Sequence, residues 1–238
     1  MKLKYLNIYI STILFLTLII IAGCKKDPVP GENEFMDERD KRIYKTVTIG
    51  WQTWMAENLA YLPSVDTVSV ESDFLPLYYI FEYDEPKLSI SRQTTNFYLY
   101  GVLYNWTAAA GACPRGWHLP TDEEWKALER FAGMDHDVAQ EIGYRKSGDV
   151  GFKLKTAASW FESFHGGDEF GFNIHPGGRK IARDVKFSEP GEEAFFWTSS
   201  SDAQNNSYLR YVTGEEPGIY RSIGSRKNGL SVRCVKDQ

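Results

Sequence analysis

Three consecutive acidic residues are the first candidates for chemistry in this sequence. Asp122, Glu123 and Glu124 could serve as paired general acid and general base carboxylates. They directly follow Thr121, however, and Thr-x-x-Glu is the capping box that begins a helix, whose first turn also favours negative charge. Capping accounts for all three side chains, so we favour it over catalysis.

The sequence gives little support for a metal site or a nucleotide-binding site. Four histidines are spread along the chain without the spacing of metal ligands: His118, His136, His165 and His175. Cys113-x4-His118 lacks the second ligand pair that a zinc site needs. No serine lies in a G-x-S-x-G turn, and no glycine-rich loop resembles a phosphate cradle. We therefore expect no metal site and no cofactor.

The N-terminus has the pattern of an export signal. Lys2 and Lys4 are followed by an almost uncharged apolar run, 5–21, and then by Ala22-Gly23-Cys24. An apolar residue, Ala, Gly and then Cys resembles a bacterial lipoprotein box. That resemblance implies removal of residues 1–23 and a diacylglycerol on Cys24. The alternative is an uncleaved membrane anchor, because the run approaches the ~20 residues that a span needs. In either case the rest of the chain is exported.

A polar tether is predicted over residues 24–36. It holds two prolines and a glycine and lacks an apolar period. Lys25, Lys26 and Asp27 directly follow the cysteine and resemble the charged signals that send some Bacteroidetes lipoproteins to the cell surface. We expect a lipid-anchored protein of the outer membrane, exposed at the cell surface, that contacts the membrane through this lipid. An ordinary charged tether is the alternative explanation.

The charge and the cysteine count limit which partners and which disulfides we expect for the folded part of the chain. The chain has 27 basic and 32 acidic residues, and loss of Lys2 and Lys4 would leave 25 against 32, a net charge of −7. A nucleic-acid partner is not expected, because such binding needs a basic patch. With Cys24 lipidated, Cys113 and Cys234 remain, and in an exported protein one disulfide is more probable than two free thiols. Residues 37–238 suit a single domain.

Residues 120–133 predict a helix at the centre of that domain. Pro120 ends what precedes it, Thr121 is a helix N-cap, and Gly133 supplies a left-handed stop. Between them, four side chains share one helical face and should be buried: Trp125, Leu128, Phe131 and Ala132.

Strands are expected on both sides of this helix. Residues 43–49 and 51–55 read as a hairpin around Gly50. Further strands are predicted at 77–83 on the domain surface, 152–154, 195–200, 208–213 and 230–235, with helices at 107–110 and 135–142 and irregular structure over 160–190. Short antiparallel strands around one or two helices, with long irregular loops, indicate the α+β class.

A family resemblance extends over nearly the whole mature chain. Its motifs are Tyr44-x-Thr46-Val47-x-Ile49-Gly50-x-Gln52-x-Trp54-Met55-Ala56-Glu57-Asn58-Leu59, Tyr100-Gly101-Val102-Leu103-Tyr104-Asn105-Trp106, Cys113-Pro114-x-Gly116-Trp117-His118-Leu119-Pro120-Thr121, Glu124-Trp125 and Ser231-Val232-Arg233-Cys234-Val235. They are similar to the Fibrobacter succinogenes major paralogous domain. That family is common in exported proteins of Bacteroidetes and Fibrobacteres, and its biochemical role is essentially undefined.

A more distant resemblance implies a particular fold. Leu119-Pro120-Thr121-x-x-Glu124-Trp125 is similar to a motif of formylglycine-generating (sulfatase-modifying) domains, and the cysteine spacing resembles the long disulfide of C-type lectin domains. Both imply a C-type lectin-like fold. The family activities do not transfer: formylglycine generation needs two active-site cysteines, and those here are expected in the bridge. Glu216-Pro217-Gly218 is nearest to a lectin calcium motif, but glycine supplies no side-chain oxygen, so a turn is expected at 214–218.

These patterns favour a non-catalytic binding or interaction module for an extracellular glycan or protein. Any ligand surface is expected on the loops over 160–190, with 214–218 contributing, because rigid scaffolds often present function on such loops. Trp160 and Phe161 are predicted to be the exposed aromatic residues there. The alternatives are an enzyme of the sulfatase-modifying type and a passive structural or fibre component of the cell envelope.

Overall fold

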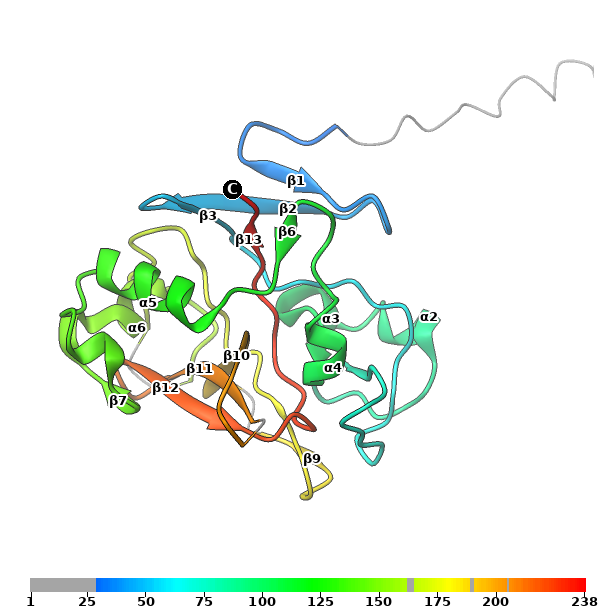
Figure 1. The fold of residues 1–238 in the computed structure, drawn as a ribbon. Coiled ribbons are helices and arrows are strands. Elements are labelled where there is room, and N and C mark those ends of the chain that lie inside the picture. Colours follow the sequence, from blue (N-terminus) through cyan, green and yellow to red (C-terminus); the bar gives the residue numbers. More distant parts are fainter. Residues whose placement is uncertain (1–28, 162–164, 189–190, 205) are drawn as a thin grey trace, which may run out of the picture.

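The computed structural model describes residues 29–161, 165–188, 191–204 and 206–238 (Figure 1). The predicted signal peptide and Cys24 lie outside the described residues. Within the described residues, no helix is both long and apolar enough to cross a membrane.

The chain forms short strands and a few short helices. In chain order they are β1 (Glu34–Met36), β2 (Ile43–Ile49), β3 (Gln52–Met55), β4 (Tyr78–Tyr79), α2 (Leu88–Ser91), α3 (Thr95–Tyr100), β5 (Leu103–Tyr104), α4 (Trp106–Ala109), β6 (Trp117–His118), α5 (Asp122–Phe131), η1 (Val138–Gln140), β7 (Gly143–Arg145), η2 (Ser147–Asp149), α6 (Val150–Leu154), β8 (Lys180–Ile181), β9 (Lys186–Phe187), β10 (Glu193–Ser201), β11 (Ser207–Thr213), β12 (Ile219–Gly224) and β13 (Val235–Lys236). Among the described residues the named strands pair antiparallel in small sheets, as predicted.

The first sheet brings the two ends of the domain together. Its strand order is β1-β2-β3-β13-β6. The predicted hairpin is present, with Val47 opposite Trp54 and with Gly50 at φ +64, where glycine is favoured. β1 falls within residues 24–36, which the sequence assigned to the tether. Phe35 of β1 packs on Trp117 with ring centroids 5.1 Å apart, so residues Glu34–Met36 are part of the folded sheet.

The second sheet has the order β10-β11-β12-β7. Its registers place Tyr211 opposite Phe195 on one side and opposite Tyr220 on the other, and Tyr220 opposite Tyr144. The sequence did not predict β12. Its residues alternate, but the side that faces the protein interior carries Arg221, so no apolar stripe marks the strand.

Helix α5 lies between the two sheets (Figure 1). The predicted capping box is present: Thr121 Oγ1 accepts from the Glu124 amide at 3.1 Å, and the Glu124 carboxylate accepts from the Thr121 amide at 2.7 Å. Trp125 packs against Trp54 of the first sheet at 5.1 Å and against Phe196 of the second at 5.6 Å. The helix therefore joins the two sheets through one tryptophan.

Buried ion pairs fasten α5 to the second sheet. Glu129 accepts from Arg145 at 2.6 and 2.8 Å and from Arg210 at 2.6 Å. Asp122 accepts from Arg210 and Arg221, each at 2.8 Å. Burial raises the pKa of Asp122, but the two guanidinium groups outweigh it and bring the pKa to about 2. The acidic first turn thus serves both capping and attachment.

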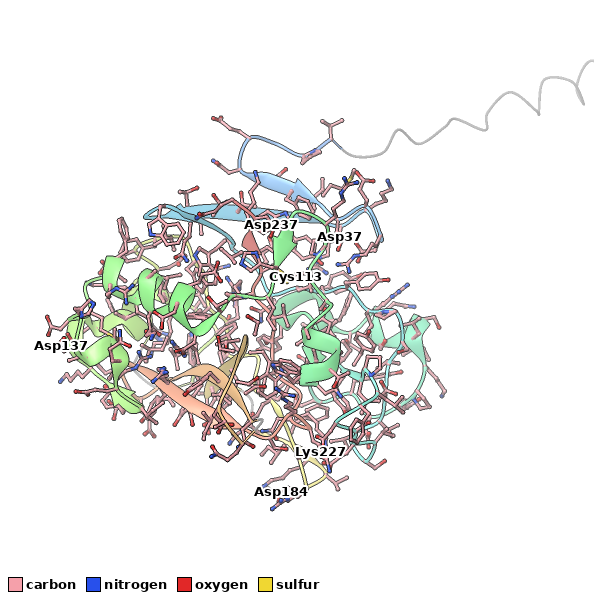
Figure 2. The ribbon with its side chains drawn as sticks, in the orientation of Figure 1. Asp37, Cys113, Asp137, Asp184, Lys227 and Asp237 are labelled. Carbon is pink, nitrogen blue, oxygen red and sulfur yellow. A yellow bond between two sulfur atoms is a disulfide. The ribbon has the colours of Figure 1, made fainter. Side chains whose placement is uncertain are left out.

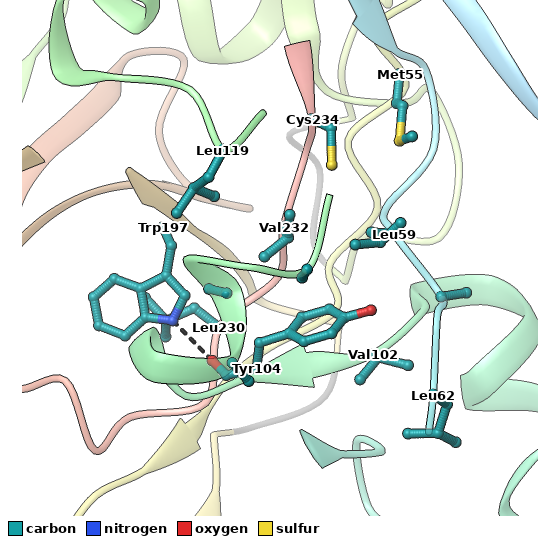
Figure 3. Close-up of a cluster of buried hydrophobic side chains, with 14 of the residues drawn as sticks. Met55, Leu59, Leu62, Val102, Tyr104, Leu119, Trp197, Leu230, Val232 and Cys234 are labelled. Atoms are coloured by element: carbon teal, nitrogen blue, oxygen red, sulfur yellow. Dashed lines mark hydrogen bonds between the residues drawn. The ribbon is translucent and has the colours of Figure 1, made fainter. Parts of the chain in front are cut away.

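The predicted disulfide joins Cys113 and Cys234, whose Cα atoms lie 5.9 Å apart. Cys234 belongs to a buried cluster that includes Leu119, Val232 and Trp197 (Figure 3), and Cys113 packs against this cluster. Trp197 Nε1 donates to the Tyr104 carbonyl at 2.8 Å, the dashed line in that figure. The bridge holds the last strand against the segment that leads into α5.

Several local predictions were wrong. Residues 152–154 belong to helix α6, because Val150 and Leu154 are buried at helical spacing, whereas Phe152 is partly exposed. The helix expected at 135–142 is a single 3-10 turn, since the chain enters β7 at Gly143 to pair with β12. Phe131 is 58% exposed rather than buried, and its ring lies against Phe170 at the end of the helix.

Two predicted strands are shorter than expected. Only Tyr78 and Tyr79 of the segment 77–83 are in a strand, and Tyr79, Ile80 and Phe81 are buried instead of on the surface. In the segment 230–235, Leu230 and Ser231 form isolated bridges to Tyr104 and Phe196 before β13 begins. In both segments, side-chain packing in the interior takes the place of continuous strand pairing.

Candidate functional site

The side of the second sheet that faces away from α5 carries a row of aromatic rings. We call it the outer face, and its rings belong to Phe195, Tyr211, Tyr220 and Tyr144, one from each strand. Successive centroids lie 4.9, 4.1 and 4.9 Å apart, and the Tyr211 and Tyr220 rings are within 9° of parallel. Phe195 is 2% exposed and belongs to the core, so only the three partly buried tyrosines of this row present ring edges and phenol groups at the surface.

The phenol groups on this face are polar donors. Burial raises the pKa of Tyr220, and the carboxylates of Glu216 and Glu215 raise it further. Burial and a hydrogen bond with Glu216 raise the pKa of Tyr144 to about 12. The tyrosines are therefore protonated at neutral pH, and acidic side chains surround them.

A pocket of about 160 Å³ opens at the end of the outer face, and we call it the acidic pocket. It is lined by Phe161, Glu192, Glu193, Thr213, Gly214 and Glu215. Burial raises the pKa of Glu193; Arg179 acts in the opposite direction, and Glu192 raises the pKa further. Thr213 Oγ1 is buried and has no hydrogen-bond partner within the described chain. The pocket therefore combines three glutamates, an aromatic ring and a threonine whose buried hydroxyl has no partner within the described residues.

A second pocket of about 190 Å³ adjoins the first and shares Glu193 with it. Its lining includes Arg179, Phe195, Tyr211 and Ser222. The Arg179 guanidinium lies 4.2 Å from the centroid of the Phe195 ring, and its buried Nε has no hydrogen-bond partner in the described part of the protein. Buried polar atoms are normally paired, so this atom and Thr213 Oγ1 are exceptions, a status that they share with Trp54 Nε1, Trp125 Nε1 and Arg145 Nε in the core.

Phe161 is exposed, as predicted, and lines the acidic pocket, whereas Trp160 does not line it. Phe161 is 60% exposed. Its ring lies over Gly191, where an added Cβ would come within 2.5 Å of the ring and φ is +77, so glycine is required there. The Phe161 amide donates to the Gly191 carbonyl at 2.9 Å. These contacts hold the ring at the pocket mouth.

The predicted exposure of Trp160 is wrong. Its side chain is 4% exposed and belongs to the core cluster around Trp125 and Phe172. Its Nε1 donates to the Ile174 carbonyl at 3.3 Å, and Lys155 Nζ lies 5.1 Å from its ring centroid. The physical reason is tertiary: Trp160 packs against residues distant in the chain, whereas the Phe161 ring lies over Gly191 near the surface.

The loop prediction located part of the site and missed the rest. Phe161 and Gly214, which the sequence placed on two separate loops, line one pocket. Glu192, Glu193 and the stacked tyrosines were missed. The alternation of 208–213 does predict a strand, but the stack depends on strand register, which this alternation does not specify.

Other candidates for chemistry have structural partners. His118 bridges Glu124 at 2.8 Å and Asp237 at 2.7 Å, which ties α5 to the chain end labelled at Asp237 in Figure 2. Partial burial lowers the pKa of His118, but the hydrogen bonds to Asp237 and Glu124 outweigh it and raise the pKa overall. Within the ranges that the structure describes, no three His, Cys, Asp or Glu side chains form a group that could hold a metal ion.

The architecture and the site define a mixed α/β domain with mostly antiparallel small sheets, one long disulfide and a shallow polar and aromatic surface. A profile of the Fibrobacter succinogenes major domain family matches residues 47–236, and the chain belongs to this family. Searches of curated proteins and of solved structures found no significant match.

Proposed function

We propose that this protein is an exported, non-catalytic binding module and that its acidic pocket receives a cationic group of the ligand. The carrying observation is that Glu192, Glu193 and Glu215 line one pocket with the exposed Phe161, and none of the three forms an ion pair in the described part of the chain. Carboxylates give charge-assisted hydrogen bonds to ammonium and guanidinium groups, and an aromatic face attracts the same cations. A lysine or arginine side chain of an extracellular protein partner fits this chemistry.

The location of the module follows from its N-terminus. We propose that Cys24 carries the lipid, that the protein is anchored in the outer membrane, and that the domain is exposed at the cell surface. The first strand begins at Glu34, so residues 25–33 would separate lipid and domain by at most about 32 Å. A domain so close to the membrane would meet macromolecular partners at its free surfaces, and nucleic acid is not among the expected ones.

We also propose a C-type lectin-like fold for the domain. Three observations support it: the chain ends meet in one sheet, a long disulfide joins the last strand to the centre of the chain, and α5 packs between the sheets. The fold alone assigns no activity. Sulfatase-modifying chemistry is the alternative, but the two cysteines it would use form the disulfide. A passive envelope component is the other alternative.

A binding screen tests the function. The full-length protein in detergent is applied to a peptide array with basic, neutral and acidic side chains and to a glycan array. We expect basic peptides to bind, and we expect Phe161→Ala and Glu193→Gln to weaken that binding by about tenfold. Phe74→Ala and Glu141→Gln are matched controls, because both residues are exposed and lie outside the pocket.

The outcomes separate the alternatives. Binding of glycans but not of basic peptides would replace the cationic ligand by a sugar. Equal binding by the pocket variants and their controls would remove the acidic pocket from the function. Absence of binding to either array would favour a passive component.

A second test addresses the anchor. Cys24→Ala should abolish incorporation of labelled palmitate and leave a precursor of higher mass. Cys113→Ala is the matched cysteine control and should still be lipidated. A Cys24→Ala variant that matures and is lipidated like the wild type would overturn the anchoring proposal.

A further inference from the structure

A separate pocket of about 210 Å³ lies where α3, the end of β3 and the last loops of the chain meet. It is lined by Arg42, Glu57, Asn58, Tyr98, Leu99, Gly101, Asn173, His175 and Arg233. It shares no residue with the acidic pocket or the pocket that adjoins it. Glu57, Asn58 and Arg233 come from the first and last of the sequence motifs quoted above, which the binding function proposed so far does not use.

The unusual feature of this pocket is the buried guanidinium of Arg233, which is 1% exposed. It donates to Asn58 Oδ1 at 2.8 Å and to the carbonyl oxygens of Met55 and Phe172. All its acceptors are neutral, and no carboxylate forms an ion pair with it within the described residues. Burial lowers the pKa of Arg233 to about 9, while Glu57 and Asp168 act in the opposite direction, so the group is charged at neutral pH.

This state differs from that of the other fully buried arginines. Arg145 and Arg210 each contact a carboxylate at 2.6–2.8 Å. A buried charge is costly unless it is paired, and neutral dipoles compensate only part of that cost. The pocket beside Arg233 is therefore a region of positive potential in a low-dielectric environment, where an anion gains more than it would at the surface.

The other lining groups indicate which anion fits. Arg42, at the start of the second strand, forms no ion pair in the described chain, and its guanidinium lies 5.4 Å from the Tyr44 ring centroid. His175 Nδ1 is buried without a hydrogen-bond partner among the described atoms. Burial lowers the pKa of His175 and the charge of Arg233 lowers it further, so the ring is neutral. Glu57 is the one acidic residue of the lining.

Two arginines and one glutamate leave the lining with a single net positive charge. We infer that this pocket binds the carboxylate of a small ligand, with the planar fork of Arg42 as the direct partner and Arg233 as a fixed charge behind it. A carboxylate matches the planar fork of a guanidinium. A phosphate would bring a second negative charge towards Glu57. The volume is below the roughly 300 Å³ of drug-sized sites, which suits a monosaccharide acid or an amino acid.

Calorimetric titration of the full-length protein in detergent tests the inference. The probes are acetate, glucuronate and alanine, with glucose as the uncharged counterpart of glucuronate. We expect acetate and at least one of the larger acids to bind and glucose not to bind. Arg42→Gln should weaken the binding about tenfold or more, because it removes a charge-assisted pair. Arg39→Gln is the matched control, since Arg39 is paired with Asp37 and does not line the pocket.

Glu57→Gln distinguishes the two sources of the carboxylate. A uronic acid should bind more tightly to this variant, because a repulsive charge has been removed. An amino acid should bind more weakly, because Glu57 would pair with its ammonium group. Arg233→Lys is the variant most prone to misfold. Its binding affinity is compared with that of the wild type only if its circular dichroism spectrum shows that it is folded.

The inference is overturned if acetate, glucuronate and alanine all fail to bind the wild type. It is also overturned if Arg42→Gln binds them as well as Arg39→Gln does. Acetate and glucuronate carry no cationic group, so their binding is independent of the cationic ligand proposed for the acidic pocket. Alanine carries an ammonium group, and loss of its binding in Arg42→Gln but not in Glu193→Gln assigns it to the Arg233 pocket.

Discussion

The two sides of the second sheet use the same strands for different purposes. Arg210 and Tyr211 are neighbours in β11, yet Arg210 points towards α5 and is fully buried, whereas Tyr211 lies on the outer face. On the inner side, the guanidinium of Arg210 is paired with Glu129 and Asp122. On the outer side, Arg179 Nε and Thr213 Oγ1 have no partner within the described residues.

This difference separates residues that stabilise the fold from residues available to a ligand. The guanidinium groups of Arg145 and Arg210 on the inner side are paired with buried carboxylates, although Arg145 Nε has no partner among the described residues, so loss of these carboxylates should reduce stability. Polar groups on the outer side lack such pairing within the described residues, so their loss should reduce binding while the fold persists. Each prediction below tests this assignment, in order of expected effect.

The largest effect is expected on the inner side. Glu129→Gln should reduce the free energy of unfolding by about 3–5 kcal/mol, because Arg145 would keep a buried charge without a carboxylate and Arg210 would keep only Asp122. Urea denaturation followed by tryptophan fluorescence measures this, with the exposed Glu141→Gln as control. A loss similar to that of the control would mean that the buried ion pairs contribute little.

Trp160 and Phe161 allow the same contrast at adjacent positions. Trp160→Ala should cost about 3–5 kcal/mol through the cavity it leaves in the core. Phe161→Ala should change stability by no more than about 0.5 kcal/mol, since its side chain is largely exposed. Thermal and urea unfolding measure the free energy of unfolding of both variants. Equal losses would contradict the assignment of Trp160 to the core and Phe161 to the surface.

A smaller effect is expected within the aromatic row. Tyr220→Leu should lower the free energy of unfolding by about 0.5–1.5 kcal/mol, because it removes stacking on Tyr211 and Tyr144. It should also weaken binding of basic peptides, since Tyr220 lies among the carboxylates of the outer face. Tyr98→Leu, an exposed tyrosine outside this row, serves as the control. Unchanged stability would show that the stack is only a consequence of strand register.

The smallest effect concerns pH. The pKa of His118 is raised in the folded protein by its two carboxylate partners, so its contribution is complete below the unfolded pKa and is lost as pH rises through the folded pKa. Because the ring is partly exposed, we expect less than about 1 kcal/mol. His118→Gln should remove this loss. Urea midpoints between about pH 5 and pH 9 measure it, with the exposed His136→Gln as control. A wild-type midpoint that rises over this interval would contradict the assignment.

Much of the framework could be read directly from the sequence. Thr121, Glu124 and Gly133 define the ends of α5 through local hydrogen bonds and backbone conformation, which do not depend on distant residues. The hairpin around Gly50 and the pairing of Cys113 with Cys234 were predicted for similarly simple reasons: strand alternation with a turn glycine, and two remaining cysteines in an exported chain.

Tertiary structure decided which side chains are buried and which are available. Trp160 and Phe161 have similar chemistry, and only packing against Phe172 and Ile174 shows that Trp160 is in the core. The aromatic row depends on the register of four strands, and the Arg233 pocket brings together Arg42 and Arg233 from opposite ends of the domain. Local sequence patterns do not specify such contacts, because they depend on how segments far apart in the chain pack together.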